Sequence, residues 1–164
     1  MADKIKIGFI GAGKIFAEYV EGCRGFHILE VAAVADMDYE RAAERAGHFG
    51  IPKALTVAEL LADPEVSIIV NLTVPVVHAE VSLAILQAGK HVYSEKPLAV
   101  RRDEGLEVLR TAQALGLWVG CAPDTFLGGG QQTCRKLIDD GWIGQPVAAV
   151  AFMAGHGPEA WHPN

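Results

Sequence analysis

The sequence predicts an α/β protein with a doubly wound parallel sheet. Short runs rich in β-branched residues alternate with longer stretches of helical periodicity along most of the chain. One of these runs, residues 66–72, is almost entirely aliphatic, which is typical of a parallel strand buried on both faces. With 164 residues, 51% of them hydrophobic, the chain suits one domain with a substantial core and is short for two.

The first half of the chain supplies the clearest helix signals. Asp38 can cap a helix over 39–49, and Thr56 with Glu59 forms a capping box that opens a helix to residue 62. Pro75 suits the first turn of a helix over 76–88, because its missing N–H has no partner to lose there. Strands are expected along the whole chain, over residues 4–10, 29–35, 66–72, 90–94, 117–121 and 146–154.

Glycines mark where several helices should stop. Gly89, Gly116 and Gly141 each follow a helical stretch, and glycine adopts the left-handed conformation that ends a helix without penalty. The remaining expected helices cover residues 14–23, 103–115 and 131–140. Strand–helix–strand repetition of this kind predicts a Rossmann-like fold.

The composition changes near Pro123, which predicts two parts. Residues 1–122 are expected to form the Rossmann-like domain, and residues 123–164 a separate part with a helix over 131–140 and a strand over 146–154. Gly128, Gly129 and Gly130 are expected to be a flexible join.

Charge and hydropathy exclude several classes. A net charge of −6 argues against a nucleic-acid partner, and no apolar stretch approaches the length of a membrane span. The N-terminus lacks the pattern of a signal peptide, and three widely spaced cysteines fit the reducing cytoplasm.

A glycine-rich turn follows the first strand. Gly11 allows a tight turn into the next helix, and Gly13 lets a pyrophosphate approach the helix N-terminus. Phe16 stands where the third glycine of the dinucleotide motif is expected. An ordinary α/β turn is the alternative, but the position between the first strand and a helix favours dinucleotide binding.

Asp36 ends the second strand, 23 residues after Gly13. A carboxylate there can accept both ribose hydroxyls of adenosine and would repel a 2′-phosphate, so it favours NAD over NADP. A helix cap is the alternative reading of Asp36, but Asp38 fills that role better.

Two charges, Glu95 and Lys96, lie at the carboxyl end of a buried strand, the edge where open α/β sheets bind ligands. A lysine there can donate to a developing alkoxide or carbonyl oxygen. Pro97 keeps Lys96 out of helical geometry. A surface ion pair of little energetic value is the alternative.

The order of these motifs resembles the Gfo/Idh/MocA family of nicotinamide-dependent oxidoreductases over residues 4–145. The resemblance rests on the glycine turn, Ala35–Asp36, the segment 71–75 with His78, and above all 88–92 followed by Glu95-Lys96-Pro97.

The resemblance implies a cofactor site spread over several loops. The residues implied to hold the pyrophosphate are Gly11, Ala12, Gly13, Lys14 and Ile15, with Asp36 on the adenosine ribose. Those implied to line the adenine and ribose side are Leu72, Thr73, Pro75 and His78, although simple packing is the alternative for His78. Glu95 would contact the nicotinamide ribose beside a cis Lys96–Pro97 bond, Pro123 would reach toward the nicotinamide, and Lys96 would be the catalytic lysine.

The family implies a hydride transfer between NAD and a sugar, polyol or related hydroxyl or carbonyl substrate, in a homo-oligomer when full length. The resemblance further implies that residues 1–122 are the NAD-binding domain and that residues 123–164 are a linker, a helix and the first strand of the substrate domain. The rest of that domain, with the acid and histidine that complete proton transfer, would follow residue 164. A non-catalytic NAD-binding sensor on the same fold is the alternative. His156, Glu159 and His162 stand three apart, but the glycine and prolines among them break any shared helix face, so we expect no metal.

Overall fold

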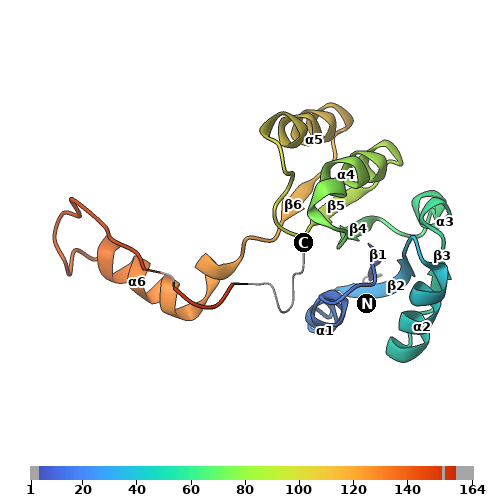
Figure 1. The fold of residues 1–164 in the computed structure, drawn as a ribbon, viewed down its shortest axis with the longest axis horizontal. Coiled ribbons are helices and arrows are strands. Elements are labelled where there is room, and N and C mark those ends of the chain that lie inside the picture. Colours follow the sequence, from blue (N-terminus) through green and yellow to red (C-terminus); the bar gives the residue numbers. More distant parts are fainter. Residues whose placement is uncertain (1–3, 153, 158–164) are drawn as a thin grey trace. The chain divides into compact units, whose positions relative to one another are not determined.

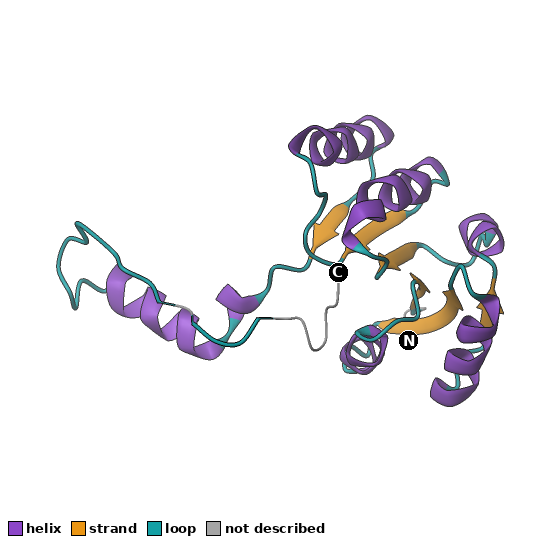
Figure 2. Cartoon of the chain, in the orientation of Figure 1, coloured by secondary structure: helices purple, strands orange, loops and turns teal. Residues whose placement is uncertain are grey.

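The computed structural model describes residues 4–152 and 154–157. The chain divides into two compact units, Met1–Pro123 and Asp124–Asn164, and each is described by itself. Unit 1 holds the sheet, and the described residues of unit 2 hold a 3₁₀ turn, an α-helix and chain without helix or strand (Figure 2).

Unit 1 is built on a six-stranded sheet in which every strand pair is parallel. The spatial order is β3-β2-β1-β4-β5-β6, so the chain leaves the centre in opposite directions from β1 and β4. The strands are β1 (Ile5–Ile10), β2 (Leu29–Ala35), β3 (Lys53–Leu55), β4 (Ile68–Asn71), β5 (His91–Ser94) and β6 (Val119–Cys121). This arrangement confirms the doubly wound, Rossmann-like fold.

Helices connect the strands and cover both faces of the sheet (Figure 1). They are α1 (Phe16–Arg24), α2 (Tyr39–Phe49), α3 (Val57–Ala62), the 3₁₀ turn η1 (Pro75–Val77), α4 (His78–Gln87) and α5 (Arg102–Leu115). Alternate residues of each strand point to opposite faces. Phe9 and Val34 therefore pack with α1 and α2, while Ile10 and Ile69 pack with α3, α4 and α5.

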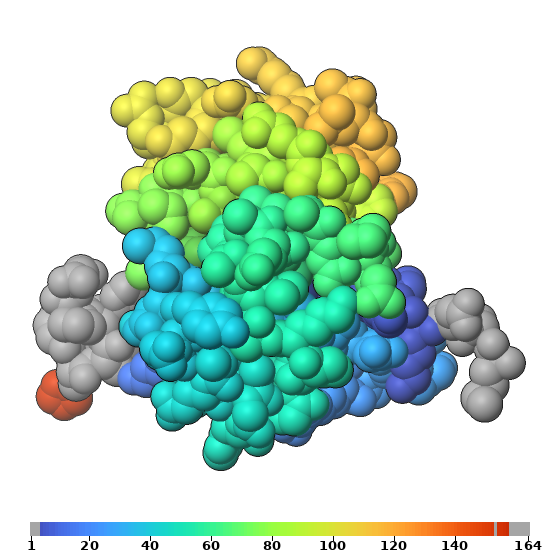
Figure 3. Space-filling model, turned by 90° about the vertical axis from the view of Figure 1, so that its right-hand side faces the viewer, coloured from blue at the N-terminus to red at the C-terminus, as the bar shows by residue number. Residues whose placement is uncertain are grey.

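The local signals read from the sequence act as expected. Asp38 accepts a hydrogen bond from the Arg41 amide at 3.4 Å, and Thr56 and Glu59 form a reciprocal capping box. Gly89 and Gly116 follow their helices with φ of 76° and 68°. At the β3 edge of unit 1, the side chains of α2 and α3 form a continuous surface (Figure 3).

The structure differs from the expectations in three places. Strand β3 was not predicted: it has only three residues, too few to show an alternating pattern, and is defined by its pairing with β2. The predicted helix over 76–88 begins as the 3₁₀ turn η1, because Pro75 and the bends around it tighten the first turn. The strand expected over 146–154 is absent from its described residues, 146–152 and 154, where no neighbouring strand offers a ladder of hydrogen bonds.

Unit 2 contains the 3₁₀ turn η2 (Thr125–Leu127) and α6 (Gly129–Asp139). The glycines expected to form a flexible join have a different role: Gly128 precedes α6, and Gly129 and Gly130 are its first residues. The helix is followed by Gly141 with φ of 79°, as its position in the sequence predicted.

Candidate functional site

One row of residues crosses the carboxyl ends of five strands. The strand register aligns Ile10 with Ala35 on one side and with Asn71 on the other. Asn71 is aligned in turn with Ser94, and Ser94 with Cys121. The residues that follow this row must therefore lie side by side along one edge of the sheet.

Backbone hydrogen bonds continue past the strand ends and fix those residues. The Gly11 amide donates to the Ala35 carbonyl at 2.9 Å, and the Leu72 amide to Ile10 at 2.8 Å. The Glu95 amide donates to Asn71 at 2.9 Å. Asp36, Gly11, Leu72, Glu95 and Ala122 thus follow one another along the edge, in strand order, as the predicted site requires.

The two glycines of the turn differ in what surrounds them. Gly11 has φ of 101°, and a Cβ there would lie 2.7 Å from the carbonyl carbon and oxygen of Leu72, so the fold itself requires glycine. A Cβ on Gly13 would meet no protein atom within 4 Å. The fold leaves open space at Gly13, which a phosphate group can use.

Helix α1 begins directly after this turn. Ile15 stands at its N-cap and no side chain caps the helix. The Phe16 amide donates to the Gly13 carbonyl at 3.4 Å, and the other amide groups of the first turn can serve an anion. Lys14 and Ile15 are exposed beside that end. The residue in the third-glycine position, Phe16, is fully buried and packs edge-to-face against Phe9 and Phe49, with ring centroids 5.3 and 5.6 Å away. An aromatic core contact replaces the close helix–strand approach that glycine would allow.

Asp36 joins the β2 end to the glycine turn. One carboxylate oxygen accepts the Ala12 amide at 2.8 Å. The other accepts the Asp38 amide at 3.0 Å and lies 3.4 Å from the Arg41 guanidinium. The carboxylate is therefore fixed beside the turn, where a ribose would lie.

Asn71 organises the loop after β4. Its side-chain oxygen accepts from the Thr73 amide at 3.2 Å and the Thr73 hydroxyl at 2.7 Å. Its amide group donates to the His78 carbonyl at 3.0 Å and the Ser82 hydroxyl at 3.2 Å. Asn71 is fully buried and its hydrogen-bonding capacity is used within unit 1.

His78 lies beneath this loop. The side chain is 1% exposed, with Nδ1 2.6 Å from the Pro97 carbonyl and Nε2 2.9 Å from the Thr73 carbonyl. Thr73 and Pro75 are half-buried at the surface above it. The structure thus places His78 among the site loops, with both ring nitrogens engaged by backbone.

The segment after β5 carries the predicted catalytic group. Glu95 accepts from the Tyr19 hydroxyl at 3.2 Å and from the Lys96 amide at 2.5 Å. The Lys96–Pro97 peptide bond is cis, as the family resemblance implied, and Lys96 is exposed. Pro123 is exposed at the end of unit 1, two positions after the row residue Cys121.

Two thiols of unit 1 are not activated. Burial raises the pKa of the Cys23 thiol, and burial likewise raises the pKa of the Cys121 thiol beside the site. A raised pKa keeps a thiol protonated and a poor nucleophile. Cys121 is therefore not a candidate nucleophile.

Over the described ranges, no group of three His, Cys, Asp or Glu side chains is placed to hold a metal ion. Of His156, Glu159 and His162, which stand three apart in the sequence, the last two lie outside those ranges. None of the helices in the part of the chain that the structure describes has the length and apolar character to cross a membrane.

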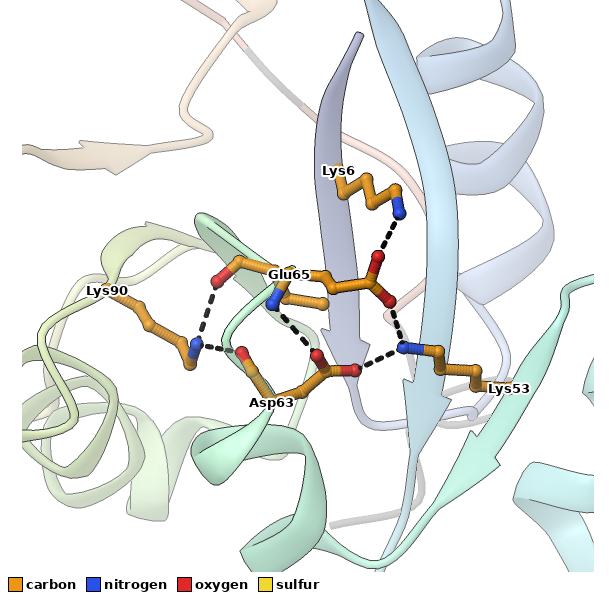
Figure 4. A network of polar contacts seen from close by, with 6 residues as sticks. Lys6, Lys53, Asp63, Glu65 and Lys90 are labelled. Carbon is orange, nitrogen blue, oxygen red and sulfur yellow. Dashed lines mark hydrogen bonds and ion pairs between the residues drawn. The ribbon is translucent and has the colours of Figure 1, made fainter. Parts of the chain in front are cut away.

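The opposite edge of the sheet carries an ion network (Figure 4). Lys53 donates to Asp63 at 2.8 Å and to Glu65 at 2.7 Å, and Lys6 donates to Glu65 at 2.5 Å. The buried Lys90 donates to the Asp63 and Val66 carbonyls at 2.5 and 2.8 Å. This network ties the starts of β1, β3, β4 and β5 together, away from the site.

The sequence assigned no role to three residues that the structure brings to the site. Tyr19 donates to Glu95, Arg41 contacts Asp36, and the buried Asn71 hydrogen-bonds Thr73, His78 and Ser82. Asn71 carried a usable signal, because a buried amide at the carboxyl end of an aliphatic strand requires partners. Tyr19 carried none, since it meets Glu95 across 76 residues only through tertiary packing. Arg41 lies five residues after Asp36, and its contact depends on the bend between β2 and α2.

Comparisons with known proteins agree with this geometry. A family model described as an oxidoreductase family with an NAD-binding Rossmann fold matches residues 5–122. The 1,5-anhydro-D-fructose reductase of Ensifer adhaerens is 36% identical over 148 residues, which are 90% of this chain and 44% of that protein. Inositol 2-dehydrogenase 3 of Saccharopolyspora erythraea is 31% identical over 88% of this chain and 44% of its own length.

A solved 3-ketoreductase from Actinomadura kijaniata, in complex with NADP, has a TM-score of 0.81 and 26% identity, over 87% of this chain and 46% of that one. The chain spans less than half the length of the curated relatives named above. The match over residues 5–122, the parallel sheet and the glycine turn at its switch point together show that the chain belongs to the Gfo/Idh/MocA oxidoreductase family, whose Rossmann domain binds NAD.

Proposed function

We propose that the carboxyl edge of the sheet binds NAD, and that the protein carrying this chain transfers a hydride between NAD and the hydroxyl carbon of a sugar, polyol or related substrate. One observation carries the proposal. The glycine turn, the Asp36 carboxylate and the Glu95–Lys96 turn lie along a single edge in strand order. A dinucleotide bound there would extend from Asp36 toward Lys96.

The residues present fit such a cofactor. The open space at Gly13 and the uncapped start of α1 suit a pyrophosphate, with Ala12, Lys14 and Ile15 around it. Leu72, Thr73 and Pro75 would line the adenine and ribose side. Glu95, Pro97 and Pro123 would border the nicotinamide. When bound, NAD supplies the hydride acceptor, and its reduced form the donor.

Asp36 supports NAD over NADP. Its carboxylate is fixed beside the turn and would accept the ribose hydroxyls. A 2′-phosphate in the same place would meet a negative charge. Arg41, which contacts Asp36, offers a partner for a phosphate if that carboxylate is removed.

Lys96 would act on the substrate. An exposed ammonium at the end of β5 can donate a hydrogen bond to the substrate oxygen and stabilise the alkoxide that develops during oxidation. In the reduction direction the same group polarises a carbonyl. The Glu95 carboxylate accepts the Lys96 amide and so fixes the turn from which the side chain leaves.

The substrate class follows from the relatives. One is named as a reductase of 1,5-anhydro-D-fructose and another as an inositol dehydrogenase, and both names describe polyhydroxylated rings. We propose that residues 123–164 begin the substrate domain and that the full protein is a homo-oligomer. The three free cysteines suit the cytoplasm.

A titration of NADH and NADPH followed by nucleotide fluorescence tests the cofactor assignment: NADH should bind more tightly. Nicotinamide absorbance with a panel of inositols and anhydro sugars tests the reaction. Lys96→Ala should abolish most turnover and keep NADH binding. Lys4→Ala, an exposed lysine at the opposite edge of the sheet, is the matched control and should keep both. Turnover retained by Lys96→Ala would refute the assigned role.

A further inference from the structure

His78 occupies an unusual position for a histidine at a ligand-binding edge. It is the first residue of α4, and its ring is almost completely buried. Each ring nitrogen lies within hydrogen-bond distance of a backbone carbonyl, Thr73 on one side and Pro97 on the other. The ring therefore spans from the loop after β4 to the turn after β5.

These contacts let the imidazole ring connect the loop after β4 with the turn after β5. A carbonyl oxygen only accepts hydrogen bonds, and a neutral imidazole donates from one nitrogen at a time. The tautomer decides which carbonyl receives the N–H of the ring, and the other ring nitrogen packs against the second carbonyl. The shorter contact, 2.6 Å, is the one to Pro97, directly after Lys96.

The base of this link is rigid. The His78 carbonyl accepts from Asn71, whose side chain also donates to Ser82 one turn further along α4. Asn71 belongs to the central strand β4, and all three residues are buried. Hydrogen bonds to Asn71 therefore hold the His78 backbone to strand β4, and helix α4 holds the ring in place.

The turn that carries Lys96 is held on both sides. Before Lys96, the Glu95 amide continues the ladder to Asn71 at 2.9 Å. After Lys96, the only contact described to the Pro97 carbonyl is from His78, among the residues that the structure covers. We propose that His78 is a positioning residue: through Pro97 it fixes the backbone from which the Lys96 side chain reaches the substrate.

This inference rests on the proposed function of Lys96, and its test separates the two. His78→Leu removes both ring contacts at similar volume, and His78→Gln keeps an amide that can donate to one carbonyl. Lys90→Met is the matched control, because it also removes a buried side chain's hydrogen bonds to two backbone carbonyls, at the opposite edge of the sheet and without contact to Pro97 or Asn71.

The first readout is amide hydrogen exchange across residues 94–99, which does not depend on activity. His78→Leu should raise exchange there about tenfold, the effect of losing one hydrogen bond. His78→Gln should fall between this variant and the wild type, and Lys90→Met should match the wild type. Unchanged exchange in the folded His78 variants, or equal acceleration in Lys90→Met, would overturn the proposal.

The second readout is steady-state kinetics in the full enzyme. Displacement of Lys96 should lower kcat by about 10- to 100-fold in His78→Leu, with the NADH dissociation constant changed far less. If exchange accelerates while kcat is retained, and Lys96→Ala still abolishes turnover, the positioning role is wrong although the proposed function holds. If Lys96→Ala also retains turnover, the proposed function itself has failed.

Discussion

The two glycines of the turn provide a sharp test because the structure assigns them opposite constraints. Gly11 has a φ of 101° and touches the Leu72 carbonyl, so alanine there is strained by the backbone and by contact. Gly13 has an ordinary φ and open space, so alanine there strains nothing in the protein. We therefore infer that Gly11 is required by the fold and that Gly13 serves the cofactor.

The magnitudes follow from these surroundings. Gly11→Ala should cost about 1–2 kcal/mol for the left-handed conformation and about 1–3 kcal/mol for overpacking against Leu72. Gly13→Ala should leave the free energy of unfolding unchanged or raise it by about 0.4–1 kcal/mol, because it restricts the unfolded chain. The same methyl group would crowd the pyrophosphate and weaken NADH binding by about 10- to 100-fold.

Urea unfolding and NADH fluorescence titration on the same preparations check both quantities. Gly22→Ala is the control, since Gly22 lies within α1 and its added Cβ would also meet open space. That variant should gain stability and bind NADH normally. Wild-type NADH affinity in Gly13→Ala, or a loss of stability equal to that of Gly11→Ala, would refute the reasoning.

Three further predictions concern side chains. Lys96→Ala should lower kcat by at least about 100-fold, measured by nicotinamide absorbance, while NADH binding is kept. Asp36→Ser should weaken NADH and narrow or reverse the preference over NADPH in competition titrations, because the repelling carboxylate is gone. Hydrogen bonds from Lys53 hold the pKa of Asp63 and that of Glu65 below their usual values. The stability from this network is therefore present above about pH 4 and lost as the pH falls through the lowered values. Urea unfolding as a function of pH should show this loss, and Lys53→Met should flatten it; an equally steep acid loss in that variant would contradict the assignment.

Local chemistry explains what the sequence could predict. The Asp38 cap, the Thr56–Glu59 capping box and the glycine stops depend on residues within one turn of each other, and all appear in the structure. The aliphatic run at residues 66–72 also predicted a buried parallel strand, because the composition of that short segment alone indicates burial on both faces. The row of site residues was also within reach, because parallel strands place their carboxyl ends at one edge.

Features that depend on distant partners could not be predicted. Strand β3 exists through its pairing with β2, and the run at 146–152 lacks such a partner among the described residues. The double contact of His78 joins loops that are 19 and 5 residues away in sequence, so no spacing rule indicates it. Phe16 shows the same limit, since only the packed core explains how it replaces a glycine.

The central claim is that the carboxyl edge of the sheet binds a nicotinamide dinucleotide. Amide hydrogen exchange with and without saturating NADH tests it most directly, because exchange locates the bound cofactor along the chain. The account predicts protection at residues 11–15, 36–38, 72–75 and 95–98. Absence of saturable NADH binding, or protection concentrated at the opposite edge around Lys6 and Ser67, would contradict it.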